Sequence, residues 1–132
     1  MDILVLTGDG IGPEIVAATL PALAALDQRF GLGLNLEERA IGFAGLAAEG
    51  STLPGGVAEA ARAADGVLLG PVDTHAYPPL EDGGINVSAW FRVNFDLYAN
   101  IRPSYTRAGV PSVAREMDLV IVRENTEGFY AD

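Results

Sequence analysis

Three arginines at the ends of predicted secondary-structure elements are the side chains best suited to chemistry in this chain. They are Arg92, Arg102 and Arg123. A guanidinium is planar and permanently charged, so it can hold a carboxylate through two parallel hydrogen bonds. Acidic residues outnumber basic ones by 18 to 8, and three cations at such positions predict a receptor for a multiply charged carboxylate. The alternative is that each arginine pairs with one of the many acids, which is the commoner use of a surface arginine.

The elements that carry these arginines follow from the pattern of apolar residues. Residues 88–95, which include Arg92, have the apolar content of a short and largely buried helix. Residues 97–101 alternate apolar with small or polar side chains, which predicts a strand that Pro103 closes. Residues 119–122 form a continuous apolar run and predict a buried strand.

The earlier part of the chain alternates predicted strands with predicted helices. Strands are expected at residues 3–6, 34–38 and 66–70, the second of them exposed and edge-like, and helices at residues 13–30, 43–49 and 54–63. Pro21 predicts a kink or break in the first helix, and Gly31 and Gly33 end it. Residues 71–85 read as a long functional loop. This order predicts an α/β fold with right-handed crossovers.

Composition excludes several classes of protein. The chain has 132 residues and is 49% hydrophobic, which is enough for one domain with a core. Its net charge of -10 argues against a nucleic-acid partner. It has no cysteine, no long apolar run and no signal-peptide pattern, so we expect a cytoplasmic protein without a membrane partner. All eight basic residues are arginine, so lysine chemistry would have to come from outside these residues.

The glycines that follow the first predicted strand do not match the standard Rossmann fingerprint. The third of Gly8, Gly10 and Gly12 comes one position early and is followed by Pro13. A tight loop before a helix can still face an anionic or amide-bearing ligand with its backbone amides. Ile11 and Gly12 are therefore the candidate cofactor contacts.

Three long motifs resemble those of the isocitrate/isopropylmalate dehydrogenase family. They are TGDGIGPE at residues 7–14, DLYANIRP at residues 96–103 and VRENTEGFY at residues 122–130, and GVLLGP at residues 66–71 fits the same order. Members of this family are metal-dependent, β-decarboxylating dehydrogenases. The resemblance implies an isopropylmalate-dehydrogenase-like fold, with a largely parallel sheet flanked by helices.

The resemblance also implies a division into domains. Residues 1–103 would be the N-terminal part of a discontinuous first domain, and residues 104–132 the start of a second domain that binds substrate and forms the dimer. We therefore expect the fold of this chain to be incomplete, and a homodimer when the protein is complete.

The chemistry that the resemblance implies is oxidation of a small 2-hydroxy acid by NAD or NADP. The resulting β-keto acid loses carbon dioxide to an enolate stabilised by Mg²⁺ or Mn²⁺, and the enolate is then protonated. In this sequence the resemblance implies that Arg92, Arg102 and Arg123 bind the carboxylates and that Tyr130 is the proton donor. A phenol suits that task if nearby cations lower its pKa.

The segment 85–89 occupies the substrate-specificity region of the family, with Asn86 and Ser88 as candidate substrate contacts. Isopropylmalate enzymes place leucines there, whereas Ser88 and Ala89 are small. Isocitrate enzymes carry serine at the position of Asn86 and asparagine at that of Ser88. Isocitrate, isopropylmalate, homoisocitrate and tartrate or malate therefore all stay open as substrates.

Two alternatives to a working oxidoreductase also stay open. The family's catalytic lysine and metal-binding acids lie beyond the matched motifs, so the chain alone is expected to be inactive and to contain no metal ligand. It would then be a non-catalytic, truncated or regulatory-type fragment that keeps part of the carboxylate-binding site. The last alternative is an unrelated α/β module that binds anions.

Overall fold

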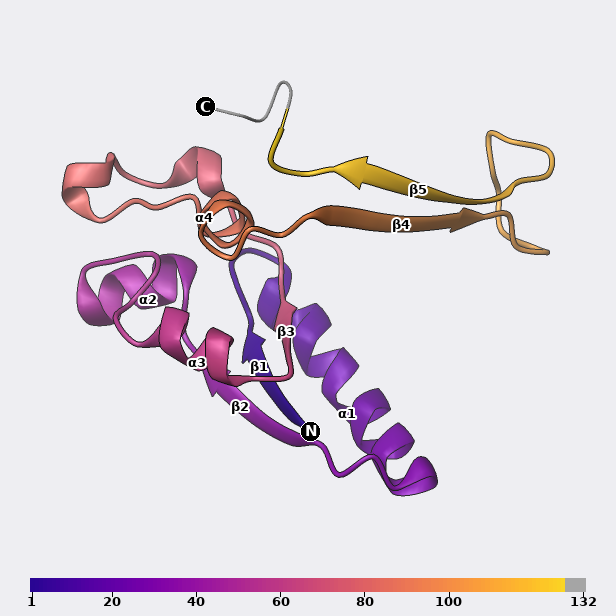
Figure 1. The fold of residues 1–132 in the computed structure, drawn as a ribbon, viewed down its shortest axis with the longest axis horizontal. Helices are drawn as coiled ribbons and strands as arrows, with labels where there is room; N and C mark the ends of the chain where they lie inside the picture. Colours follow the sequence, from indigo (N-terminus) through magenta and orange to yellow (C-terminus); the bar gives the residue numbers. More distant parts are fainter. Residues whose placement is uncertain (128–132) are drawn as a thin grey trace. The chain divides into compact units, whose positions relative to one another are not determined.

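The computed structural model describes residues 1–127, and the chain divides into two compact units, Met1–Val87 and Ser88–Asp132 (Figure 1). The predicted domain boundary after Pro103 concerns the complete protein and stays a prediction.

The first unit is built on a three-stranded parallel sheet. β1 (Asp2–Leu6) lies between β2 (Asn35–Arg39) and β3 (Gly66–Leu69). The three strands lie close to where the sequence predicted them, and the expected α/β class with a parallel sheet is confirmed. The centre of the core is the end of β1, where three side chains are at most 1% exposed: Leu4, Val5 and Leu6.

Two of these strands lie at the edges of the sheet as described. The exposed character predicted for β2 is confirmed, since most of its residues are exposed. The prediction of a buried third strand is wrong for the described residues, because Val67 is 38% exposed. β3 pairs with β1 alone among these residues, so its outer side meets no further strand.

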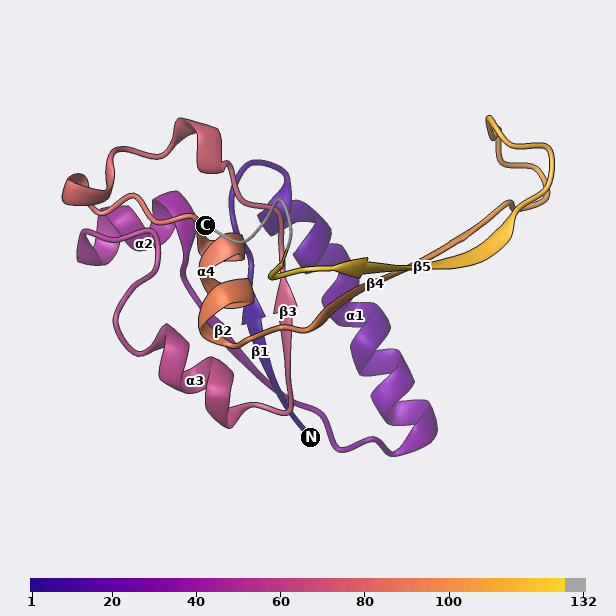
Figure 2. The same ribbon diagram turned by 45° about the horizontal axis from the view of Figure 1, so that its top comes forward.

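Three helices accompany the sheet, with α1 over one face and α3 over the other (Figures 1 and 2). They are α1 (Gly12–Phe30), α2 (Gly42–Glu49) and α3 (Val57–Ala63). Of the kink or break predicted at Pro21, the break is wrong, since α1 continues through this residue. Proline removes only one backbone hydrogen bond from a helix of 19 residues. Gly31 ends it in the left-handed conformation, as predicted.

The third helix begins later than the sequence predicted. It starts at Val57 instead of Pro54, because Gly56 has a φ of +82° that a right-handed helix cannot include. The long loop that follows β3 is confirmed and contains two short 3₁₀ turns, η1 (Thr74–Ala76) and η2 (Leu80–Asp82).

The second unit contains most of α4 (Val87–Asn94) and an antiparallel pair of strands, β4 (Ala99–Tyr105) and β5 (Asp118–Glu124). The helix confirms the predicted element, but it is not largely buried as predicted: Phe91 is 6% exposed, whereas Val93 is 65% exposed. Trp90, Phe91 and Phe95 form edge-to-face aromatic contacts.

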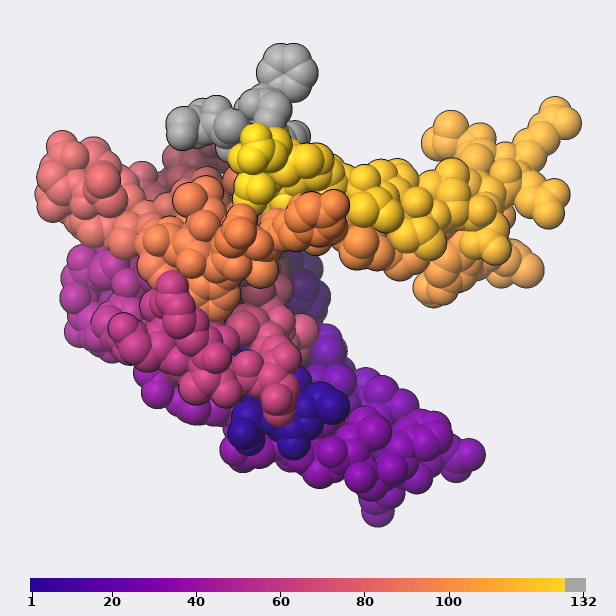
Figure 3. All heavy atoms as spheres, in the orientation of Figure 1, coloured from indigo at the N-terminus to yellow at the C-terminus, as the bar shows by residue number. Residues whose placement is uncertain are grey.

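Two predictions for the strands of this unit are wrong. β4 does not end before Pro103 but continues through it, with Pro103 opposite Val120. β4 has one strand partner in the described residues, so a residue without an N–H can face the open side. β5 is not buried: Val120 and Val122 are 59% and 64% exposed, and side chains of both strands lie at the surface of their unit in Figure 3.

Close backbone packing at the end of β1 gives a testable prediction. Gly8 and Gly10 both have positive φ, but a Cβ at Gly8 would lie 2.1 Å from the carbonyl oxygen of Pro71, whereas nothing lies within 4 Å at Gly10. We expect Gly10→Ala to lower the free energy of unfolding by about 1 kcal/mol and Gly8→Ala by about 3 kcal/mol or more, since only the second adds a clash to the backbone strain. Urea unfolding of the two variants measures the difference, and equal losses would contradict the packing described.

Candidate functional site

A buried carboxylate organises the loop that follows β1. Asp9 is 7% exposed. Its Oδ1 accepts a hydrogen bond from the Phe43 amide at 2.7 Å, and its Oδ2 accepts one from the Asp73 amide at 3.1 Å. The hydroxyl of Tyr77 donates a further hydrogen bond to Oδ2. Three segments that are far apart in the sequence therefore meet at one side chain.

The same carboxylate caps α2 from outside the helix. The N-cap residue, Ile41, makes no side-chain capping bond, and Asp9 instead accepts the hydrogen bond of an amide in the first turn. A negative charge at this end of a helix is favourable. Gly42 makes the approach possible, because a Cβ there would lie 2.2 Å from the Asp9 carboxylate.

The environment of Tyr77 keeps its hydroxyl protonated. Burial raises the pKa of Tyr77, and the hydrogen bond to Asp9 and the negative charge of that carboxylate raise the pKa further. The ring of Tyr77 also lies edge-on to Phe43, with 5.2 Å between ring centroids. Tyr77 therefore acts as a hydrogen-bond donor that fixes the long loop and is a poor candidate for exchanging protons with a substrate.

The raised pKa of Tyr77 gives a prediction with a defined sign. The pKa of Tyr77 is higher in the folded protein than the ordinary value of 10.0. Its contribution to the stability of the fold is therefore complete below pH 10.0 and is lost at higher pH, where the unfolded chain ionises first. Asp9→Asn should bring the pKa of Tyr77 down towards the ordinary value, although burial should keep it above that value. Ultraviolet titration of tyrosinate measures the shift.

The matched control for that titration is Tyr77→Phe, which should remove the late-titrating tyrosine and leave the other tyrosines unchanged. An Asp9→Asn protein in which the late tyrosine titrates as before would show that the carboxylate does not act on Tyr77.

The two candidate cofactor residues lie where α1 begins. The amide of Gly12 donates to the carbonyl of Asp9 at 2.8 Å, and a Cβ at Gly12 would lie 2.2 Å from the carbonyl oxygen of Thr7. The Gly12 amide is therefore already hydrogen-bonded within the loop, and the contact of Gly12 with a cofactor stays a prediction. The Ile11 side chain is 60% exposed and accessible to a cofactor.

The candidate substrate residues in and before α4 are accessible as well. Asn86 immediately precedes α4, Ser88 is the second residue of the helix, and Arg92 lies in its last turn. Asn86 and Ser88 are exposed and Arg92 is partly exposed. Ser88 and Arg92 are four positions apart, so they share a face of the helix.

The register of β4 and β5 brings the other two arginines together. Arg123 lies opposite Asn100, and Arg102 follows Asn100 by two positions. Because side chains alternate between the faces of a strand, all three share one face, and Arg102 and Arg123 are diagonal neighbours about 7–8 Å apart. The Nε of Arg102 donates to Oδ1 of Asn100 at 3.1 Å, so this bond goes to a neutral amide and not to an acid.

The end of β5 is held by a residue that sequence reasoning did not single out. Asn125 is 5% exposed, and its Nδ2 donates to the carbonyl of Leu97 at 3.0 Å. It therefore ties the strand end that carries Arg123 to the connection between α4 and β4. Asp9, Thr52 and Tyr77 were also missed as site-forming residues; an acid between glycines directly after a buried strand was the available signal for Asp9.

Three further expectations concern the proton donor, metal ligands and membrane-spanning helices. The predicted proton donor, Tyr130, lies outside the described residues. Residues 1–127 contain no group of three or more histidine, cysteine or acidic side chains that could hold a metal ion. Within the same residues, none of the helices combines the length and apolar character that crossing a bilayer requires.

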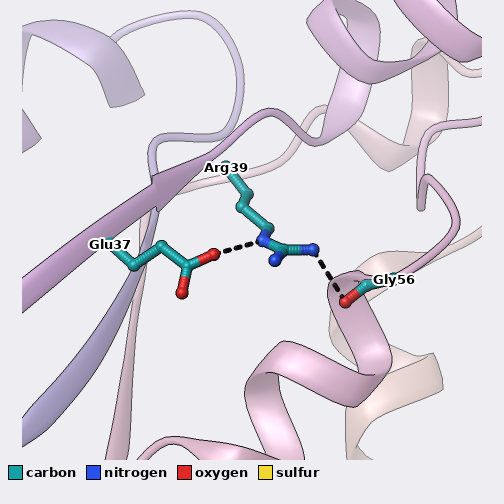
Figure 4. Close-up of polar contacts among 3 residues, drawn as sticks. All are labelled: Glu37, Arg39 and Gly56. Carbon is teal, nitrogen blue, oxygen red and sulfur yellow. Dashed lines mark hydrogen bonds and ion pairs between the residues drawn. The ribbon is translucent and has the colours of Figure 1, made fainter.

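A cavity of about 550 Å³ in the first unit contains none of the predicted site residues. It lies between the sheet and α3, and Arg39 is one of its lining residues. Nε of Arg39 contacts Oε1 of Glu37 at 2.6 Å, and Nη1 donates to the carbonyl of Gly56 at 3.0 Å (Figure 4). Arg39 therefore joins β2 to the start of α3, which is a structural role.

Comparison with known proteins agrees with the motifs. The family model for isocitrate/isopropylmalate dehydrogenase matches residues 2–132. The chain belongs to this family. The predicted resemblance and the predicted fold class are thus confirmed, and the family is one of dehydrogenases.

Two relatives and two solved structures illustrate the similarity. The chain is 40% identical to a 3-isopropylmalate dehydrogenase of Thermobifida fusca over 96% of its own length and 37% of the relative's. It is 38% identical to one of Methylococcus capsulatus over 97% and 38% of the two lengths. An isocitrate dehydrogenase structure from Methylococcus capsulatus has a TM-score of 0.81 at 33% identity, covering 98% of this chain and 36% of that one.

The second structure is a β-decarboxylating dehydrogenase from Thermococcus kodakarensis, with a TM-score of 0.67 at 29% identity; the match covers 96% of this chain and 34% of that one. The chain thus spans little more than a third of the length of these relatives.

Proposed function

We propose that this chain is the N-terminal part of a β-decarboxylating dehydrogenase that oxidises a malate-type 2-hydroxy acid with NAD or NADP. The observation that carries the proposal is the shared face of β4 and β5, on which Arg102 and Arg123 are neighbours. Within a family of dehydrogenases, two arginines on one face of a strand pair, in a chain of net charge -10, suit an anionic substrate.

The roles proposed for the side chains are binding and proton transfer. Arg102 and Arg123 hold carboxylates of the acid, and Arg92, on α4, holds a further one. Fixed cations orient the substrate so that its hydroxyl-bearing carbon can deliver hydride to the nicotinamide. Tyr130 protonates the enolate that remains after loss of carbon dioxide. Ile11 and Gly12 contact the cofactor, and the lack of a side chain at Gly12 leaves room for the carbonyl of Thr7.

A bound Mg²⁺ or Mn²⁺ would supply charge stabilisation for that enolate. Residues 1–127 do not form a metal site, so we propose that its ligands come from elsewhere in the full-length protein. We also propose a cytoplasmic homodimer for that protein.

The side chains before and within α4 favour some substrates over others. Asn86 and Ser88 are polar and exposed, and Ala89 is small. A site lined by hydrogen-bonding groups discriminates against a substituent that leaves them unpaired. We therefore propose that the C3 substituent of the substrate is polar, as in isocitrate, homoisocitrate or tartrate, in preference to the isopropyl group of isopropylmalate.

A second candidate function is carboxylate binding without turnover. The observation in its favour is that every basic residue of the chain is arginine, so these residues offer no catalytic lysine. A chain that binds a malate-type acid and yields no reduced cofactor would support this candidate.

Metal dependence separates the two candidates in the full-length protein. We expect reduction of NAD or NADP with at least one malate-type acid when Mg²⁺ or Mn²⁺ is present, and loss of that activity on chelation, because the enolate then lacks its stabilising charge. Absorbance of the reduced nicotinamide measures both. Turnover that survives chelation would overturn the proposed mechanism.

Replacement of one arginine tests the carboxylate site. Arg102→Leu should raise the KM for the hydroxy acid by about 10-fold to 100-fold, the loss expected for a charge-assisted hydrogen bond, and leave the KM for the cofactor unchanged. Arg107→Leu is the matched control, because Arg107 is exposed and its Nη2 contacts the hydroxyl of Tyr105 at 2.6 Å, away from Arg102. If the two replacements raised the KM for the hydroxy acid equally, Arg102 would not be a residue of the carboxylate site.

A further inference from the structure

Thr52 is a completely buried polar residue whose hydrogen bonds converge on the end of the long loop. It is 0% exposed. Its amide donates to the carbonyl of Gly83 at 2.9 Å, and its carbonyl accepts from the amide of Gly42 at 2.8 Å. Its Oγ1 accepts from the amide of Ile85 at 2.7 Å and donates to the carbonyl of the same residue at 2.9 Å. The side chain thus satisfies both backbone groups of Ile85, as a neighbouring strand would.

The backbone beside Ile85 is fitted closely to the rest of the first unit. Gly83 has a φ of +87°, and a Cβ there would lie 2.0 Å from the carbonyl oxygen of Gly50. A Cβ at Gly84 would lie 1.7 Å from the carbonyl oxygen of Pro78. Residues 83–85 therefore have one tightly defined path, which the hydrogen bonds of Thr52 hold in place.

The candidate substrate residues come directly after this anchored segment. Asn86 lies between Ile85, which Thr52 holds, and Val87, which is 0% exposed. Ser88 is the next residue. The backbone that presents Asn86 is thus fixed on both sides, while its own side chain is exposed.

We propose that Thr52 is a positioning residue for substrate recognition, acting through Ile85 on Asn86 and Ser88. The inference rests on the proposed function of that segment. Thr52 is too deeply buried to touch a substrate, so it acts by fixing the residues that do. A displacement of about 1 Å in such residues is enough to cost a large factor in activity.

The test uses Thr52→Val and Thr52→Ser in the full-length protein. Valine keeps the shape of threonine but removes the hydroxyl, so both backbone groups of Ile85 lose their partner, whereas serine keeps the hydroxyl. We expect Thr52→Val to raise the KM for the hydroxy acid by about 10-fold, a loss typical of one broken buried hydrogen-bond pair, and to leave the KM for NAD or NADP unchanged. Thr52→Ser should keep the KM for the hydroxy acid close to that of the wild-type protein.

The matched control for a general loss of stability is Val57→Ala. Val57 is 2% exposed, lies in α3 and sends its amide hydrogen bond to Pro54, not to residues 83–85. This variant should lower the melting temperature without changing the KM for the acid. The inference is overturned if Thr52→Val raises that KM no more than Val57→Ala does, or raises the KM for acid and cofactor alike.

Amide hydrogen exchange separates this inference from the proposed function. Thr52→Val should speed exchange at residues 85–88, and Val57→Ala should not. If the wild-type protein turns over no malate-type acid, the proposed function fails, and faster exchange still shows the anchoring. If the enzyme is active and exchange at residues 85–88 is unchanged in Thr52→Val, the inference about Thr52 fails alone.

Discussion

A buried carboxylate is the constraint on which the first unit depends. Burying the charge of Asp9 is costly unless hydrogen bonds replace its water, and here the donors come from α2, from the amide of Asp73 and from the hydroxyl of Tyr77. Because the donors belong to two separate segments, α2 and the long loop, the carboxylate is satisfied only when both are in place. The glycine loop, the start of α2 and the long loop therefore share one arrangement.

The long loop is fixed at both ends by buried polar side chains from elsewhere in the first unit. Asp9 holds its beginning through Asp73 and Tyr77, and Thr52 holds its end through Ile85. The proposed cofactor contact at Ile11 lies beside the first anchor, and the proposed substrate contact at Asn86 follows the second. Proteins commonly carry binding residues on loops that a rigid scaffold holds in place. In this protein each end of the loop is held by one buried side chain, Asp9 or Thr52.

Periodicity and motifs predicted the positions of the strands and helices and the family, but not the contacts that hold the loops. Asp9 reads locally as a turn residue, and its partners Phe43 and Tyr77 are 34 and 68 positions away, beyond any local pattern. That Arg102 and Arg123 share one face of the strand pair follows from the register of β4 and β5. The sequence of the intervening loop does not specify this register. Burial of β5 was predicted from its apolar run, yet burial depends on covering elements, which the described residues do not provide.

The most direct test of the proposed function is the ratio of carbon dioxide released to nicotinamide reduced by the full-length protein acting on a malate-type acid. β-Decarboxylating oxidation predicts one carbon dioxide for each NADH or NADPH, with isocitrate, homoisocitrate or tartrate preferred to isopropylmalate. Reduced nicotinamide formed without carbon dioxide would mean a simple alcohol dehydrogenation and would contradict the account.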